Sequence, residues 1–252
     1  MYKNTVSVLL ISIVVSSCSS GGGGTPQTVA AAVDPSLQAA AAAAENSHDY
    51  SGAVQHLTTL YDHHPGDREI GLALARNLRH AGQGQTGADL MQSLLVGHAG
   101  DQDLLLELGK DYLAVDRIEL AVTVLTQARA VAPGRWETLS TLGAALDTAS
   151  RTADALAVLA DADRLSPDNP VILNNLGLCQ AVAGHLDQAV ATLRRASDLP
   201  TATVQVRENL AMLLALQGDA GQAEKFTRHD LPTAQADANA ATYRQWAAAR
   251  RN

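Results

Sequence analysis

Residues 142–162, LGAALDTASRTADALAVLADA, decide the fold of this chain, because residues 176–196, LGLCQAVAGHLDQAVATLRRA, repeat their pattern 34 positions later. Both stretches open with Leu-Gly. Small and apolar residues then fall in register: Ala155 with Ala189, Leu159 with Leu193, and Ala162 with Ala196. Similarity at a fixed period of this length is typical of an array in which one supersecondary unit is stacked on the next.

The same period extends in both directions. Leu108-Gly109 lies one step before this core and Leu210-Ala211 one step after it, while Pro133 and Pro167 form another column. A column of small residues comprises Ala53, Gly87, Ala121, Ala155, Ala189 and Ala223. The frame predicts about six units: 34–67, 68–101, 102–135, 136–169, 170–203 and 204–237. The three units from 102 to 203 match best, and the unit 68–101 is degenerate.

Spacings within each unit predict two helices. Ala121, Leu125 and Ala128 stand at i, i+4 and i+7, which is one face of a helix. Gly184 stands where a left-handed residue would end a first helix, and prolines follow the second helices. Aromatic residues make up only 3% of the chain although 46% of it is hydrophobic. A chain whose apolar residues are mainly Ala and Leu favours close-packed helices over sheets, so the predicted fold is all-α.

This pattern resembles the tetratricopeptide repeat (TPR), a helix–turn–helix unit of 34 residues. The resemblance implies an α-solenoid over 34–237, a right-handed superhelix of helix–turn–helix pairs. Residues 234–249 are expected to form a C-terminal capping helix, whose Tyr243 and Trp246 pack against the last repeat.

The N-terminus has the form of a lipoprotein signal peptide. Residues 1–17 hold a basic Lys3 and an apolar stretch that suits a signal core and is too short to span a bilayer. Val15-Ser16-Ser17-Cys18 resembles the lipobox of bacterial lipoproteins, which implies lipid attachment at Cys18; an ordinary cleaved signal is the alternative. Residues 18–33, rich in Ser and Gly, are predicted to be a flexible tether. By the same resemblance, Ser19 implies the periplasmic face of the outer membrane of a Gram-negative bacterium.

The composition argues against several functions. The net charge is −8, and a nucleic-acid partner would call for a basic face. No catalytic or dinucleotide-binding motif is present, so we expect no enzyme activity, no small-molecule substrate and no cofactor beyond the covalent lipid on Cys18. For His56 with His63-His64, solvated surface is favoured over a metal site, and Cys179 is predicted to be a small buried hydrophobe.

The repeat resemblance implies a concave surface lined by the first helix of each pair, where a protein partner would bind. The predicted groove residues are Asp103, Glu107, Lys110, Glu137, Ser140, Thr141, Asp147, Asn174, Asn175, Gln205, Glu208 and Asn209. This set is more acidic than basic, so a neutral or basic partner segment is expected. Asn175 and Asn209 are equivalent positions whose amides could pair with a ligand backbone, or Asn is simply common there.

The C-terminal third of the sequence narrows the resemblance from TPR proteins in general to one family of them. Val206-Arg207-Glu208-Asn209-Leu210-Ala211, Asp230-Leu231-Pro232, Ala238-Asn239-Ala240 and Tyr243 resemble TadD, the TPR lipoprotein family of the tight-adherence (Flp) pilus system. The implied function is a non-catalytic scaffold, anchored in the outer membrane, that supports assembly or localisation of the pilus secretin. Three alternatives remain: a general envelope adaptor that recruits cell-wall enzymes, a pilotin of another pilus or type II secretion system, and an enzyme with no recognisable motif.

Overall fold

The computed structural model describes residues 26–249, and all regular secondary structure in that range is α-helical. The prediction of an all-α fold is therefore confirmed. The helices are α1 (Pro26–Asn46), α2 (Tyr50–His63), α3 (Arg68–His80), α4 (Gly84–Gly97), α5 (Gln102–Ala114), α6 (Ile118–Val131), α7 (Trp136–Thr148), α8 (Thr152–Leu165), α9 (Pro170–Val182), α10 (Leu186–Ser197), α11 (Val204–Gln217), α12 (Ala220–Asp230) and α13 (Thr233–Ala249).

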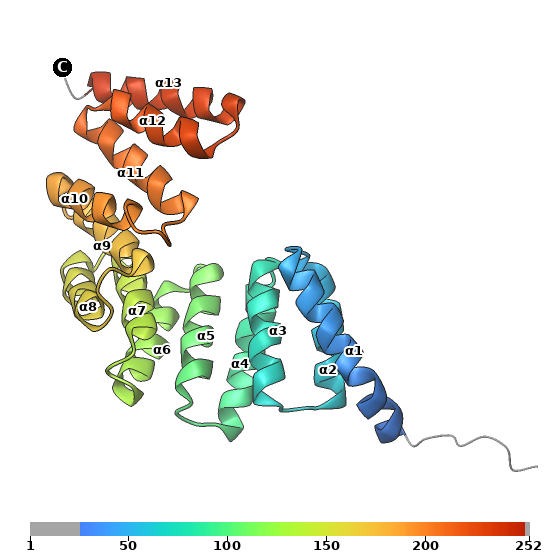
Figure 1. The fold of residues 1–252 in the computed structure, drawn as a ribbon. Coiled ribbons are helices and arrows are strands. Elements are labelled where there is room, and N and C mark those ends of the chain that lie inside the picture. Colours follow the sequence, from blue (N-terminus) through green and yellow to red (C-terminus); the bar gives the residue numbers. More distant parts are fainter. Residues whose placement is uncertain (1–25, 250–252) are drawn as a thin grey trace, which may run out of the picture.

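The helices come in antiparallel pairs, and α13 closes the series (Figure 1). From α3 to α11 the first helix of each pair begins 34 residues after the previous one, at Arg68, Gln102, Trp136, Pro170 and Val204. The first pair departs from the sequence prediction, because α1 begins at Pro26, inside the segment 18–33 that was predicted to be tether. Proline is tolerated in the first turn of a helix, and alanine, which fills positions 30–32, is the best helix former.

The turn inside each pair uses one left-handed residue. Gly184 has φ +83°, as predicted, and the His185 N–H after it donates to the Gln180 carbonyl at 2.9 Å. This bond satisfies a carbonyl group that would otherwise be left free at the end of the first helix. The same 34-residue period places positive φ values at His48, Gly82, Asp116, Ser150, Gly184 and Gly218. The repeat is therefore a property of the backbone as well as of the side chains.

In each well-matched pair the two helices approach each other closely at a glycine. A Cβ atom added to Gly143 would lie 2.4 Å from Cγ of Leu159, a side chain with no exposed surface. Real carbon atoms do not approach so closely, so α7 and α8 can meet only because position 143 has no side chain. Gly109 with Leu125 and Gly177 with Leu193 repeat the arrangement.

The first helices form the inner layer of the array. Each of α3, α5, α7 and α9 packs against the first helix of the next pair, and α11 packs against α13. Within residues 26–249, no two second helices pack against each other to a similar extent. First helices that lie closer together than second helices make the array curve, with the first helices on its concave side. Figure 1 shows this curvature from α1 at one end to α13 at the other.

The last helix closes the core only in part. Tyr243 of α13 is 6% exposed and packs with the buried residues of α10 and α11, as predicted. Trp246 stays 38% exposed, with its ring centroid 5.9 Å from that of Tyr243. It is next in sequence to Ala247, one of the buried residues of α13 together with Ala236, Ala240 and Tyr243. None of the helices in 26–249 combines the length and apolarity needed to cross a membrane.

Candidate functional site

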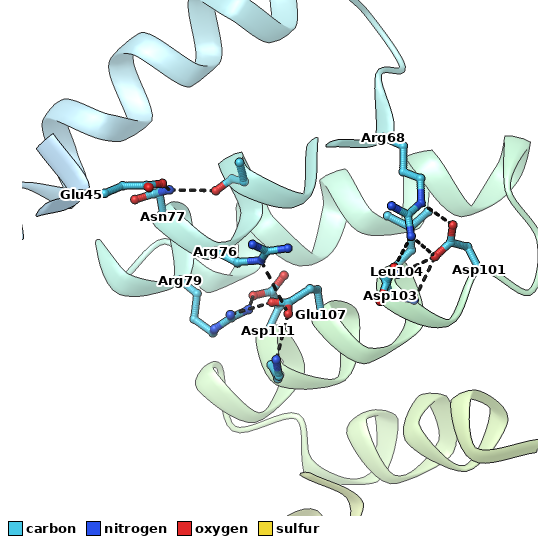
Figure 2. Close-up of polar contacts among 12 residues, drawn as sticks. Glu45, Arg68, Arg76, Asn77, Arg79, Asp101, Asp103, Leu104, Glu107 and Asp111 are labelled. Atoms are coloured by element: carbon cyan, nitrogen blue, oxygen red, sulfur yellow. Dashed lines mark hydrogen bonds and ion pairs between the residues drawn. The ribbon is translucent and has the colours of Figure 1, made fainter. Parts of the chain in front are cut away.

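The N-terminal half of the concave face is occupied by internal ion pairs (Figure 2). Arg79 of α3 donates from Nη2 to Glu107 Oε2 at 2.7 Å and from Nη1 to Asp111 Oδ1 at 2.6 Å. Lys110 Nζ lies 2.8 Å from Glu107 Oε1. Because Glu107 is only 6% exposed and Asp111 is fully buried, these charges need their partners. Glu107 and Lys110 were predicted to face a ligand; in the structure they pair with each other, and Glu107 also pairs with Arg79 of α3.

The pKa values of the two carboxyl groups in this network are shifted in opposite directions. Burial alone would raise the pKa of Glu107, but Lys110 and Arg79 outweigh it and the pKa is lowered. Burial raises the pKa of Asp111 to about 6, although Arg79 opposes the shift. The cluster thus contains one carboxyl group that changes charge close to neutral pH.

A second network joins α3 and α5 to the start of α7. Arg68 Nε lies 2.6 Å from Asp101 Oδ2, and Arg68 also pairs with Asp103, as Figure 2 shows. Asp103 pairs in turn with Arg135, which precedes α7. Asp103 was also predicted to face the groove, and it serves here as a link between α3, α5 and α7. The sequence frame missed Arg68 and Arg79 because the unit 68–101 carries few repeat residues.

Glu137 and Thr141 stand between the two halves of the face. Glu137 keeps 39% of its side chain exposed, with Arg135 Nε 3.7 Å from Oε2. The Thr141 hydroxyl donates to the carbonyl of Glu137 at 2.8 Å, within its own helix. Of the predicted groove residues in α5 and α7, Glu137 is thus the carboxylate best placed to meet a partner.

The C-terminal half of the face carries a row of hydrogen-bonded amides. Asn175 Nδ2 donates to Ser140 Oγ at 3.0 Å, and Asn209 Nδ2 donates to Asn174 Oδ1 at 2.7 Å. Asn174 Nδ2 lies 3.5 Å from Asn175 Oδ1, and Gln205 Nε2 donates to Asn209 Oδ1 at 3.1 Å. The structure therefore links five of the predicted residues of α7, α9 and α11 through hydrogen bonds. We call Ser140, Asn174, Asn175, Gln205 and Asn209 the amide row.

The amide row is only partly saturated by these internal bonds. A primary amide has two N–H donors and an oxygen with two lone pairs. Asn175 uses one of its donors on Ser140, and Asn209 uses one of its donors on Asn174. Asn174, Asn175 and Asn209 are all partly exposed, so their remaining groups can reach a ligand.

The amide row ends at a pocket between α11 and α13. This end pocket has a volume of about 250 Å³ and is lined by Glu208, Asn209, Met212, Asn239, Thr242, Tyr243 and Trp246. Asn239 Nδ2 donates to Glu208 Oε2 at 3.2 Å, and burial raises the pKa of Glu208. A carboxylate that burial disfavours gains from a cationic neighbour. Sequence reasoning found Glu208 and Asn209 but assigned Trp246 to a cap, because it had no signal that α13 leaves the indole open.

Two other predictions concern isolated groups. Cys179 is fully buried, its Sγ lies 3.7 Å from the Thr152 carbonyl oxygen, and burial raises the pKa of the thiol to about 12, which fits a packing role. His63 Nδ1 and His64 Nε2 lie 2.6 and 2.5 Å from the two oxygens of Asp34 on α1. These histidines thus bind an internal carboxylate. Cys18, the signal 1–17 and the tether up to residue 25 lie outside the described residues.

Comparisons with known proteins agree with this architecture. Residues 148–199 match the sequence model of the tetratricopeptide repeat. A thermophilic TPR protein of Thermus thermophilus shares the fold, with a TM-score of 0.64, 22% identity, and coverage of 70% of this chain and 98% of that one. PilF of Pseudomonas aeruginosa gives 0.60 at 14% identity, over 81% and 92%. MamA of Desulfovibrio magneticus gives 0.51 at 18% identity, over 63% and 92%.

None of the curated protein sequences matches the chain. The family match covers parts of two of the three units that the sequence frame fits best, and the structural likeness extends over most of the helices. The predicted repeat fold is therefore confirmed: the chain has the fold of a tetratricopeptide-repeat solenoid.

Proposed function

We propose that this chain is a non-catalytic scaffold that holds a neutral or basic segment of a protein partner on its concave face, from α7 to α13. The observation that carries the proposal is the amide row, which runs across α7, α9 and α11 and ends at the pocket of Glu208 and Trp246. The ion-paired half of the face, from α3 to α5, stiffens the array and leaves the C-terminal half for binding.

The two parts of this surface suit two parts of one ligand. Amides that offer both donors and acceptors can pair with the backbone of an extended segment whatever its side chains are. The end pocket then selects a side chain, because an indole face and a partly buried carboxylate both attract a cation. A Lys or Arg side chain that lies between Trp246 and Glu208 would satisfy both groups.

The more specific proposal is that the scaffold is an outer-membrane lipoprotein of tight-adherence pilus assembly. It is supported by the lipobox at Cys18 and by the closing segment from Asp230 to Tyr243, both features of the sequence. Acyl chains on Cys18 would fix the solenoid to the periplasmic leaflet, since several chains together anchor a protein stably. The groove would then capture a secretin or another assembly component.

A deletion strain tests this proposal when it is complemented with three forms of the full chain: wild type, Cys18→Ala and Trp246→Ala. The wild type should restore surface pili and secretin multimers. Cys18→Ala should lose incorporation of a palmitate analogue and fail to restore them, and Trp246→Ala should keep the label and restore them poorly. Normal pili in the deletion strain would contradict the pilus proposal. Co-purification with cell-wall enzymes would then favour the general adaptor, and a defect in another secretin would favour a pilotin.

A further inference from the structure

A second cavity lies on another side of the molecule, between α10, α11 and α12. It has a volume of about 460 Å³, within the range of ligand sites, and is lined by Arg194, Arg207, Gln222, Lys225, Phe226 and His229. Arg207 faces it from α11, next in sequence to the Glu208 that lines the end pocket. We call this cavity the basic pocket. Its lining contains cationic and apolar groups and, within the described residues, no carboxylate.

The basic pocket holds cations that this acidic chain leaves unneutralised. Across residues 26–249 every arginine and lysine forms an ion pair with a described carboxylate except Arg117, Arg194 and Lys225. Two of these three exceptions line the same cavity. In a chain with a net charge of −8, this clustering is the reverse of what the composition favours.

Neighbouring contacts orient the lining without cancelling its charge. Arg194 Nη2 donates to Gln222 Oε1 at 2.5 Å, so a neutral amide holds the guanidinium in place. The nearby Asp219 accepts from the Gln222 backbone N–H at 2.9 Å, and Glu224 pairs with Arg244 at 2.7 Å. Arg207 binds the buried Asp230 with two hydrogen bonds, so its charge is already matched.

The apolar part of the lining is supplied by Phe226, the only phenylalanine of the chain. Its ring packs partly against the buried residues of α10 and α11 and leaves a face toward the cavity. A ligand that suits both features carries carboxylates for Arg194 and Lys225 and an apolar side chain for Phe226.

We infer that the basic pocket is a docking site for an acidic segment of a partner protein, in which Asp or Glu residues flank an aromatic or aliphatic side chain. The site goes beyond the concave groove, from which it differs in charge preference and, apart from the shared α11, in the helices that line it. The solenoid would thus hold two partner segments of opposite charge, one on each side of α11.

The test screens the purified full chain in detergent against a random dodecapeptide library and measures the affinity of selected peptides by fluorescence anisotropy. One selected class should carry acidic residues beside an apolar one. Lys225→Glu should weaken its binding by about tenfold or more, as expected for loss of a favourable charge pair. Arg117→Glu is the matched control, because it reverses another exposed, unpaired cation outside the cavity, and it should leave the affinity unchanged.

Three results would overturn the inference. The first is that the screen recovers no peptides with acidic residues beside an apolar one, or that such peptides bind the Lys225→Glu and Arg117→Glu chains with equal affinity. The second is binding of phosphatidylglycerol vesicles that Lys225→Glu alone abolishes while no peptide class is recovered, which would assign the cavity to a lipid headgroup. The third is self-association of the wild type that Lys225→Glu alone removes, which would assign it to a second copy. Glu208→Gln should leave this peptide class bound, which separates the basic pocket from the groove.

Discussion

At the scale of single residues, one repeat position changes its chemistry along the array. The position is Glu107 in α5, Thr141 in α7, Asn175 in α9 and Asn209 in α11, at intervals of 34. Where it is an acid it joins Arg79 in a buried ion pair, and where it is an amide it bonds to the unit before it. The repeat thus fixes where a side chain lies, and its chemical type decides whether it holds the scaffold together or meets a ligand.

The buried Asp111 gives the first prediction at this scale. Its folded-state pKa of about 6 lies above the ordinary 3.8, so between these values the folded chain binds more protons than the unfolded chain. Stability contributed by this group is therefore present at low pH and lost as pH rises from about 4 to about 6. Removing the charge with Asp111→Asn should abolish the loss.

Urea unfolding at a series of pH values measures this effect. Relative to wild type, the free energy of unfolding of Asp111→Asn should rise by about 2 kcal/mol between about pH 4 and 6.5. Asp116→Asn is the control, since Asp116 is exposed and Asn tolerates its left-handed backbone equally well. Parallel pH profiles for Asp111→Asn and wild type would show that Asp111 titrates normally.

At the scale of elements, the helix pair is specified by a few close contacts. Gly143 lets α7 approach α8, and a left-handed residue at position 150 or 184 reverses the chain between the paired helices. Both features recur every 34 residues, so the period of the sequence alone predicts where the pairs lie.

Gly143→Ala tests this account of the pair. Alanine has a higher helix propensity by about 1 kcal/mol, but its Cβ would overlap the buried Leu159. Overpacking should outweigh propensity and lower the free energy of unfolding by about 1–2 kcal/mol, measured by urea titration of helical circular dichroism. Gly134→Ala is the control, because no atom lies within 4 Å of its added Cβ. An unchanged or raised stability for Gly143→Ala would mean that the helices are free to shift apart.

The sequence predicts the elements far better than the contacts between them. Columns such as Ala155, Leu159 and Ala162 are local and periodic, so they predict helices and faces directly. Glu107 also lies on the predicted concave face, but its partner Arg79 is 28 residues away, out of step with the repeat. No period signals that pairing. The end pocket was missed for a similar reason: the exposure of Trp246 depends on how α13 lies on α11, which neither helix encodes alone.

At the scale of the whole molecule, the array separates support from binding. Ion-pair networks join α3, α5 and α7, and the amide row joins α7, α9 and α11. Because each unit of a solenoid contacts chiefly its neighbours, a rigid N-terminal half can hold a binding half without sharing its chemistry. In the proposed anchoring at Cys18, this half would also separate the groove from the membrane.

In the proposed function, the C-terminal half of the concave face holds a neutral or basic partner segment. To test this, a photo-crosslinking amino acid is placed at Gln205, the exposed member of the amide row, and at Thr123, an exposed residue on the second helix of its pair, in cells that make the full chain. After irradiation, the crosslinked peptides are identified by mass spectrometry. We expect one recurrent partner segment, containing Lys or Arg, to be crosslinked at Gln205 and not at Thr123. The yield of this crosslink should fall in the Glu208→Gln variant. An acidic segment at Gln205, or the same segment at both positions, would contradict it.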